Sequence, residues 1–177
     1  KVIGDRLLKI VRFQDKTVTD KLVANRAEVH LNTKQVIVQE NIELKSIKPP
    51  VQVATIKIIW KYEARKVTSS KPVKLIHYQQ GVTITGNQAE VDLTNNIAYL
   101  RGGVQGNSTA NAAKLYSNDL TWDINTQIIE ALGNVIYEQT NPDLNLTGEK
   151  AVGTIHNNKI VVSGNAQDRV ITEIFLE

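Results

Sequence analysis

The apolar and polar positions of residues 120–135 predict a pair of antiparallel strands. Apolar residues occupy every second position in two segments, which puts them on one face of each strand. Between the segments, Asn125 and Thr126 favour a reversal, because short polar side chains hydrogen-bond the nearby backbone. Gly133 and Asn134 tolerate a positive φ, so we expect the second strand to end there in a corner or bulge. The alternating apolar positions are Leu120, Trp122, Ile124, Ile129 and Ala131.

The same pattern recurs at an interval of 31 residues. Copies begin near residues 27, 89, 120 and 151. A further copy is expected near residue 58, where an alternating run begins and then loses the pattern. A fixed period of this length is typical of stacked repeats, in which no unit can bury its apolar face without its neighbours. We therefore expect residues 1–177 to form a single domain of five units, of which the unit at 58 is degraded.

These repeats predict an all-β fold. Val, Ile, Leu and Ala dominate the apolar residues, whereas aromatic residues make up only 5% of the chain. Each unit places a polar reversal between two strands, which is hairpin geometry and favours antiparallel pairing over a parallel solenoid. Small residues such as Gly102 and Gly103 allow strands to bend from one sheet to another. We expect a twisted, open jelly-roll, or β-taco, with an apolar seam inside and unpaired first and last strands.

Two segments depart from the regular pattern. Residues 1–13 fit both strand and helical spacing, and we expect an irregular start followed by an edge strand. Residues 64–74 are basic and contain Pro72, and we expect a mobile loop there. Residues 1–80 carry 16 basic and 7 acidic side chains, whereas residues 81–177 carry 5 and 11. The basic end is suited to an anionic surface or ligand, although solvated strand faces explain the same charges.

Candidate catalytic and metal-binding groups are sparse. The chain has no cysteine, and His30, His77 and His156 lack the spacing of a metal site. A carbohydrate-acting jelly-roll enzyme would need paired carboxylates in a cleft, and the repeats place Asp92 and Asp123 on the polar face instead. The basic half lacks interleaved aromatic residues, which argues against nucleic-acid binding. We expect no enzymatic activity, no cofactor, no metal and no nucleic-acid partner.

The repeats resemble the periplasmic bridge proteins of lipopolysaccharide transport, the LptA/LptC (OstA-like) family. The resemblance is carried by Gly133-Asn134-Val135, by its variants at residues 102–104 and 164–166, and by their 31-residue interval. It covers roughly residues 24–175. The run from Leu120 to Gly164 is most similar to the LptC-type members of cyanobacteria.

This resemblance implies a periplasmic bridge that passes lipopolysaccharide from an inner-membrane ABC transporter complex toward the outer membrane. Lipid A acyl chains would lie in the apolar seam, and other Lpt jelly-rolls would join by strand addition. LptC-type members are tethered to the inner membrane by an N-terminal helix. This chain begins at Lys1 and shows neither a signal peptide nor an apolar run of about 20 residues, so we expect a mature or truncated piece.

Three sets of residues follow as candidate sites. The candidate lipid groove consists of Val29, Leu31, Val36, Val38, Val91, Leu93, Leu100, Trp122, Ile124, Ile129, Ile155, Ile160 and Val162. The candidate partner edge strand consists of Val170, Ile171, Ile174 and Phe175, and the candidate head-group contacts are Arg65, Lys66, Lys71 and Lys74. Small residues such as Ala98, Ala131 and Gly153 favour an under-filled seam. The alternative is a structural β-repeat scaffold or adhesin with a filled core.

Overall fold

The computed structural model describes residues 1–110, 112–140, 143–155, 160–164 and 171–174, and within these ranges it consists of strands and turns without a helix. Fourteen strands form one sheet in which every pair is antiparallel, as the repeats predicted. The strands are β1 (Val2–Gln14), β2 (Thr17–His30), β3 (Gln35–Ser46), β4 (Val51–Lys61), β5 (Lys66–Ser69), β6 (Val73–His77), β7 (Val82–Gly86), β8 (Gln88–Asp92), β9 (Ile97–Ser108), β10 (Ala113–Asp123), β11 (Ile128–Thr140), β12 (Asp143–Thr154), β13 (Ile160–Ser163) and β14 (Ile171–Ile174).

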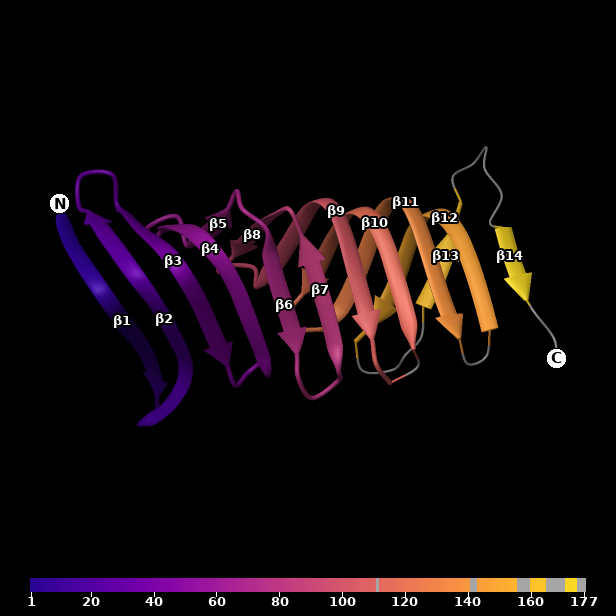
Figure 1. Cartoon of the computed structure of the whole chain (residues 1–177), viewed down its shortest axis with the longest axis horizontal. Helices are drawn as coiled ribbons and strands as arrows, with labels where there is room; N and C mark the ends of the chain where they lie inside the picture. The colour runs from indigo at the N-terminus through magenta and orange to yellow at the C-terminus, as the bar shows by residue number, and fades with distance from the viewer. Residues whose placement is uncertain (111, 141–142, 156–159, 165–170, 175–177) are drawn as a thin grey trace.

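The chain runs as an up-and-down meander of long rungs, where a rung is one crossing from turn to turn. Some rungs are one long strand, and others are two short ones. β5 and β6 form one rung because both pair with β4, and β7 and β8 form the next because both pair with β9. β13 and β14 both pair with β12. The rungs stack from the N-terminus to the C-terminus along the long axis of the molecule (Figure 1).

Each rung bends near its middle, so the sheet has two walls. We call the wall that contains β6, β7 and β14 the front wall, and the wall that contains β5, β8 and β13 the rear wall; β5 and β8 lie behind in Figure 1. β9 to β12 cross from one wall to the other. Positive φ angles and register shifts mark the bend in β3, β9 and β11. The residues with positive φ are Glu40, Asn41, Gly102, Gly103, Gly133 and Asn134.

Two expectations about strand ends are wrong. The second strand of the hairpin does not end at Gly133-Asn134, because β11 bends there through a bulge and continues to Thr140. Residues 64–74 are not one loop. They contain β5 and the start of β6, which are separated by Ser70–Pro72 at the position of the bend, where proline cannot join the ladder. By contrast, β1 pairs only with β2 and is the expected edge strand.

Turns at the rear rim repeat every 31 residues and are bonded to one another. The last residue of each turn has a positive φ, and its carbonyl accepts a hydrogen bond from a backbone N–H at the start of the next turn. This stacking explains why the repeat length is so regular, since an insertion in one turn would break the bond to its neighbour. The bonds are Tyr62 N to Lys34 O at 3.2 Å, Leu93 N to Arg65 O at 2.8 Å, Ile124 N to Asn96 O at 2.9 Å and Ile155 N to Gln127 O at 3.1 Å.

Candidate functional site: the seam between the walls

Most of the predicted groove residues lie on the inner face of the rear wall. Successive pairs in the antiparallel ladder align them into one row, the rear inner row, that crosses the whole stack. The row consists of Val2, Val29, Val36, Trp60, Val67, Val91, Ala98, Trp122, Ile129, Gly153 and Ile160. Val38, Leu100 and Val162 lie two residues nearer the bend, and Leu93, Ile124 and Ile155 lie at the rim.

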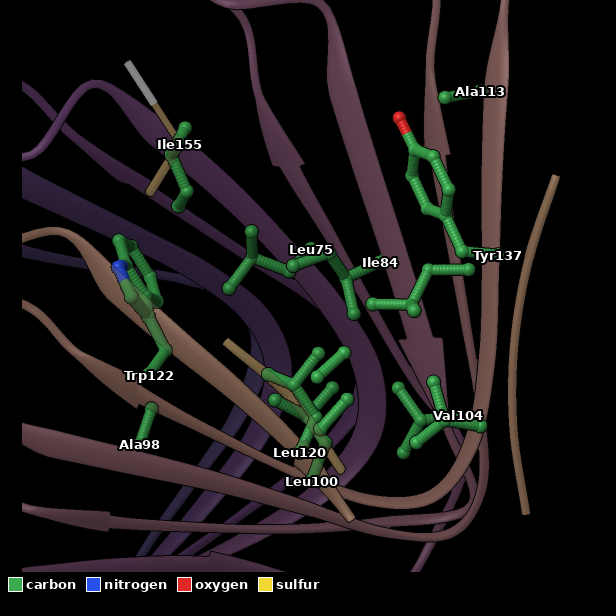
Figure 2. Packing of buried hydrophobic residues seen from close by; sticks show 14 of the residues in the cluster. Leu75, Ile84, Ala98, Leu100, Val104, Ala113, Leu120, Trp122, Tyr137 and Ile155 are labelled. Carbon is green, nitrogen blue, oxygen red and sulfur yellow. The ribbon is translucent and has the colours of Figure 1, made fainter. Parts of the chain in front are cut away.

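The facing row on the front wall was missing from the sequence prediction. Its side chains pack against the rear wall across the seam, and Figure 2 shows Leu75 and Ile84 opposite Trp122 and Leu120. In the long strands, the alternation of apolar and polar residues resumes after the bend, and this signal could have identified the front row. The front inner row consists of Leu22, Leu44, Val53, Leu75, Ile84, Gly106, Leu115, Tyr137 and Leu146.

Burial along the seam increases from the N-terminal rungs to the C-terminal ones. Trp60 and Trp122 share the rear inner row, yet Trp60 is 40% exposed and Trp122 only 2%. At the rim, Leu31 is 57% exposed, Leu93 and Ile124 are half-buried, and Ile155 is 5% exposed. Leu31 therefore differs from its expected inward position. It lies one residue beyond the last ladder pair, as Ile155 does, so its exposure reflects the weaker covering of the rim in the open half. We call β1–β4 the open half and β9–β12 the closed half.

The seam contains two small apolar cavities. One, of about 120 Å³, lies between Leu44 and Val53 on the front wall and Val67 and Val91 on the rear wall. The other, of about 90 Å³, lies in the closed half beside Tyr137. Typical ligand pockets have volumes of roughly 300–1,000 Å³. Neither cavity has room for a long acyl chain while the walls keep this separation.

One polar group beside the 90 Å³ cavity has no hydrogen-bond partner among the described residues. It is Ser108 Oγ, on the front wall of the closed half. A buried hydroxyl without a partner costs about 1–3 kcal/mol. The closed seam therefore carries a local penalty that parting of the walls would relieve.

The two aspartates of the repeats cap turns at the rear rim. Asp92 Oδ1 accepts bonds from the backbone N–H groups of Thr94 at 2.8 Å and Asn95 at 3.0 Å, and Asp123 does the same for Asn125 and Thr126. These backbone bonds lower the pKa of both carboxyl groups, because they stabilise the charged form. Their role is therefore to hold turns.

The four basic residues proposed for head groups are not gathered in one place. Lys66 forms an ion pair with Glu90 at 3.0 Å, and Arg65 donates to the Leu93 carbonyl at 3.1 Å, both near the rear rim. Lys71 lies at the bend, in the break between β5 and β6, and Lys74 lies on the outer face of the front wall. Only Arg65 and Lys66 are near the mouth of the seam.

The two ends of the stack have different edge strands. At the C-terminal end, Ile171 and Ile174 belong to β14, which pairs with β12 through residues 144–147. Val170 and Phe175, the other members of the predicted edge, lie outside the described residues. At the N-terminal end, β1 exposes several apolar side chains, with Leu7 77% and Phe13 62% exposed.

The described part of the chain contains no cluster of three or more His, Asp or Glu side chains that could hold a metal ion. None of its segments forms a helix long and apolar enough to span a membrane.

No curated protein sequence matches the chain. Among solved structures, the chain is similar to LptH of Pseudomonas aeruginosa, described as the LptA-homologous periplasmic component of the conserved lipopolysaccharide transport device. The two share 12% identity with a TM-score of 0.36, over 89% of this chain and 95% of that one.

A family model described as "Lipopolysaccharide-assembly, LptC-related" matches residues 8–109. The match runs from within β1 to the end of β9, whereas residues 120–164, which carry much of the sequence resemblance, lie outside it. Because it spans more than half of the chain, the chain belongs to the LptC-related family of lipopolysaccharide assembly.

Proposed function

We propose that this chain is a periplasmic bridge component that binds lipopolysaccharide in the seam and passes it from the inner-membrane transporter toward the outer membrane. The observation that carries the proposal is the pair of inner rows, largely apolar, which runs from β2 to β12 in a protein of the LptC-related family. Such rows give acyl chains an apolar path along the axis of the stack, without a chemical step.

The open half is the entry for the acyl chains in this proposal. Near the rim its inner residues are only partly covered, as the 40% exposure of Trp60 and the 60% exposure of Val2 illustrate. The two cavities of the seam have volumes of about 90 and 120 Å³, so lipid can advance into the closed half only if the walls part. Hydration or ligand bonding of Ser108 would offset part of that cost.

In this proposal, head groups are contacted at the rear rim, and partner proteins bind at the two ends of the stack. Arg65 and Lys66 lie at the rear rim, where anionic head groups would project from the mouth of the seam. We propose that other Lpt jelly-rolls join by strand addition at the exposed edges, β1 at one end and β14 at the other. We further propose an N-terminal membrane tether outside this sequence.

A second candidate function is a structural β-repeat scaffold with a permanently filled core. The small cavities of the closed half favour it, since Leu120, Trp122 and Val135 are each no more than 2% exposed. In this case the open half would be a docking surface for protein alone, and no lipid would enter between the walls.

Photo-crosslinking distinguishes the two candidates. We would replace Trp60, Ile124 and Trp122 one at a time by p-benzoylphenylalanine and irradiate each variant with lipopolysaccharide. The bridge proposal predicts a strong lipid adduct at position 60, an adduct at 124, and one at 122 only when lipid has moved into the closed half. Asp123 faces outward and serves as the matched control.

The bridge and the scaffold predict different lipid adducts. Adducts at 60 and 124 but not at 123, together with weaker adducts from a plain phospholipid, support the bridge. A folded protein with no lipid adduct at any inner position would establish the scaffold instead. Replacing Ile124 or Leu93 by glutamate should abolish lipid capture with only a modest loss of stability, because both side chains are half-buried at the rim.

A further inference from the structure

The sheet has a gap at the bend of the degraded unit. β4 pairs with β6 up to Ala54 and with β5 only from Ile59 onward. On the other side, β9 pairs with β8 up to Arg101 and with β7 from Gln105 onward. The ladder is therefore interrupted across four neighbouring rungs. Buried hydroxyls close the gap from inside, with Thr55 Oγ1 3.2 Å from Ser69 Oγ and donating to the Pro72 carbonyl at 2.9 Å.

A long groove lies on the outer face over this gap. Its volume is about 1,020 Å³, the largest of the cavities described, and it extends from β3 to β11 along the bend. It lies on the opposite side of the sheet from the seam, because its side chains alternate with inward residues such as Ile42, Val73 and Val104. The outward residues of the groove are Asn41, Glu43, Ile56, Lys74, Thr85, Asn87, Gln105, Tyr116, Asn118 and Asn134.

Amide side chains dominate the polar lining of this groove. Asn134 Nδ2 donates to Asn118 Oδ1 at 3.3 Å, which leaves the Asn118 amino group and the Asn134 carbonyl oxygen for another partner. Asn87 Nδ2 donates to the Gly102 carbonyl, so its own Oδ1 is left in the same way. An amide offers both a donor and an acceptor, which is the pattern that neighbouring hydroxyl groups of a sugar present in return.

The remaining lining residues fit the same ligand class. Tyr116 is half-buried on the outer face and gives a flat surface on which the C–H face of a sugar ring can stack. Among the described residues that line the groove, Glu43 and Lys74 are the only charged ones, and their charges cancel. This balance disfavours a strongly anionic ligand such as a nucleic acid.

We propose that the outer groove binds a neutral oligosaccharide chain, laid along the bend across successive rungs. Rungs lie about 4.8 Å apart, close to the length of one sugar residue, so amides on successive rungs can meet successive sugars. Asn87, Gln105, Asn118 and Asn134 bond the hydroxyl groups and Tyr116 stacks on a ring. The proposal does not depend on lipid entering the seam, because the groove and the seam lie on opposite faces of the sheet.

NMR titration of the ¹⁵N-labelled chain tests this site directly. The probes are four neutral hexasaccharides, built of glucose, mannose, galactose and N-acetylglucosamine, and an uncharged hexapeptide for comparison. We expect at least one sugar to shift the side-chain amide signals of Asn87, Asn118 and Asn134 in a saturable manner. Tyr116→Ala should weaken that binding at least tenfold, whereas Tyr116→Phe should retain it because the ring is kept.

Controls separate this site from unfolding and from the seam. Asn107→Ala removes an exposed amide two residues beyond Gln105 on β9, outside the groove, and should leave binding unchanged. Gln105→Ala should weaken it, with the backbone spectrum preserved in both variants. No shift with any of the four sugars would overturn the proposal. It would also be overturned by binding that survives Tyr116→Ala, or by shifts with the peptide alone.

Discussion

Trp60 and Trp122 occupy the same position in repeats that lie 62 residues apart, and their surroundings differ sharply. Both belong to the rear inner row, but one is 40% exposed and the other 2%. In the closed half, Trp122 lies between Ala98 and Ile129 in the ladder and faces the front wall. In the open half, Trp60 has Val36 and Val67 as neighbours and an edge contact with Tyr62, with ring centroids 6.2 Å apart.

The comparison shows that one repeat pattern can produce two different environments. The buried apolar residues also form one large cluster and one small cluster. The large cluster contains Trp122, Leu120 and Val135, whereas the buried members of the small cluster are only Ala24, Val38 and Ile42. Stability should therefore come mainly from the closed half, and apolar surface available for binding mainly from the open half.

Truncating the two tryptophans should give the largest contrast. Trp122→Ala should lower the free energy of unfolding by about 3–5 kcal/mol, because it leaves a cavity in a packed core. Trp60→Ala should cost only about 1 kcal/mol, since much of the ring is already in contact with water. Chemical denaturation followed by circular dichroism measures both. Equal losses would show that the open half is packed as tightly as the closed half in solution.

The bends offer a second, smaller contrast. Gly133 has a positive φ of 75°, and a Cβ there would lie 2.6 Å from Asn118 Nδ2. Gly133→Ala should therefore destabilise the protein by about 1–2 kcal/mol, from backbone strain and displacement of that amide. At the corresponding bend of the open half, Glu40 has a positive φ without being glycine. Glu40→Gly should change stability little, because relief of strain is offset by the entropy of the unfolded chain.

Thermal denaturation of both bend variants measures this difference. A loss at Glu40→Gly as large as that at Gly133→Ala would show that the Glu40 side chain, rather than the backbone bend, stabilises β3. Restoring stability to Gly133→Ala by Asn118→Ala would identify the close contact as the cause.

Fluorescence quenching compares the two tryptophans by how far a solute in water can reach each ring, rather than by stability. Replacing one tryptophan by phenylalanine leaves the other as the only indole, since the chain has two. Iodide should quench Trp60 strongly and Trp122 weakly, in line with their exposures. Addition of lipopolysaccharide should protect Trp60. Unchanged quenching at saturating lipid, in a protein that binds it, would place the lipid elsewhere.

The sequence was sufficient for the all-β repeat, the antiparallel pairing and part of the rear inner row, although Val2, Trp60 and Val67 were not among the predicted groove residues. Alternation with a 31-residue interval specifies which residues share a face, and the ladder aligns Val36, Val91 and Trp122 as predicted. The front inner row was missed because Gly133-Asn134 was interpreted as a strand end, so Tyr137 was not assigned to the same long strand as Ile129.

Other features depend on information that alternation does not contain. Leu31 and Ile155 have the same place in the repeat, yet one is 57% and the other 5% exposed. The difference comes from how far apart the walls lie, which is set by packing between residues distant in sequence. The outer groove was likewise missed, because amides spread over several rungs form no local motif.

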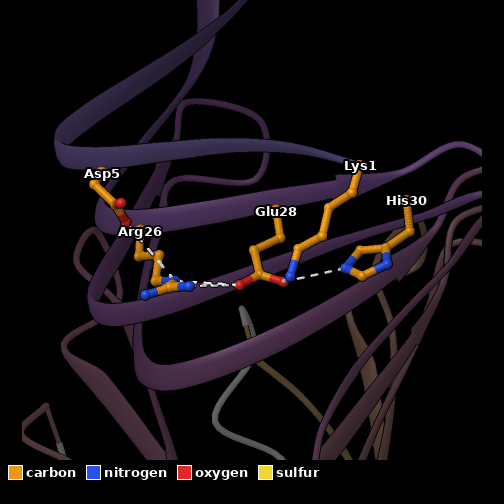
Figure 3. A network of polar contacts seen from close by, with 5 residues as sticks. All are labelled: Lys1, Asp5, Arg26, Glu28 and His30. Atoms are coloured by element: carbon orange, nitrogen blue, oxygen red, sulfur yellow. Dashed lines mark hydrogen bonds and ion pairs between the residues drawn. The ribbon is translucent and has the colours of Figure 1, made fainter.

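The smallest expected effect concerns the ion pairs that hold β1 on the open half. Glu28 is surrounded by Lys1 at 2.9 Å, Arg26 at 2.8 Å and His30 at 3.1 Å (Figure 3). Hydrogen bonds from these three side chains lower the pKa of Glu28 from 4.5 to about 2. A lowered pKa in the folded state stabilises the fold at pH values above the unfolded value, and this contribution disappears as the pH falls from about 4.5 to about 2.

Glu28→Gln should therefore lower the thermal midpoint slightly at pH 7, and the difference from the unmodified protein should shrink as the pH falls through that range. Glu63→Gln is the matched control, because its ion pair with Lys34 has both side chains more than half exposed and should contribute almost nothing. Melting curves at several pH values between 7 and 2 measure the difference. If the effect of Glu28→Gln is independent of pH, β1 is held by its backbone ladder alone. The open half would then need no charged contacts to keep its edge strand in place, and the contrast with the closed half would rest on the apolar seam.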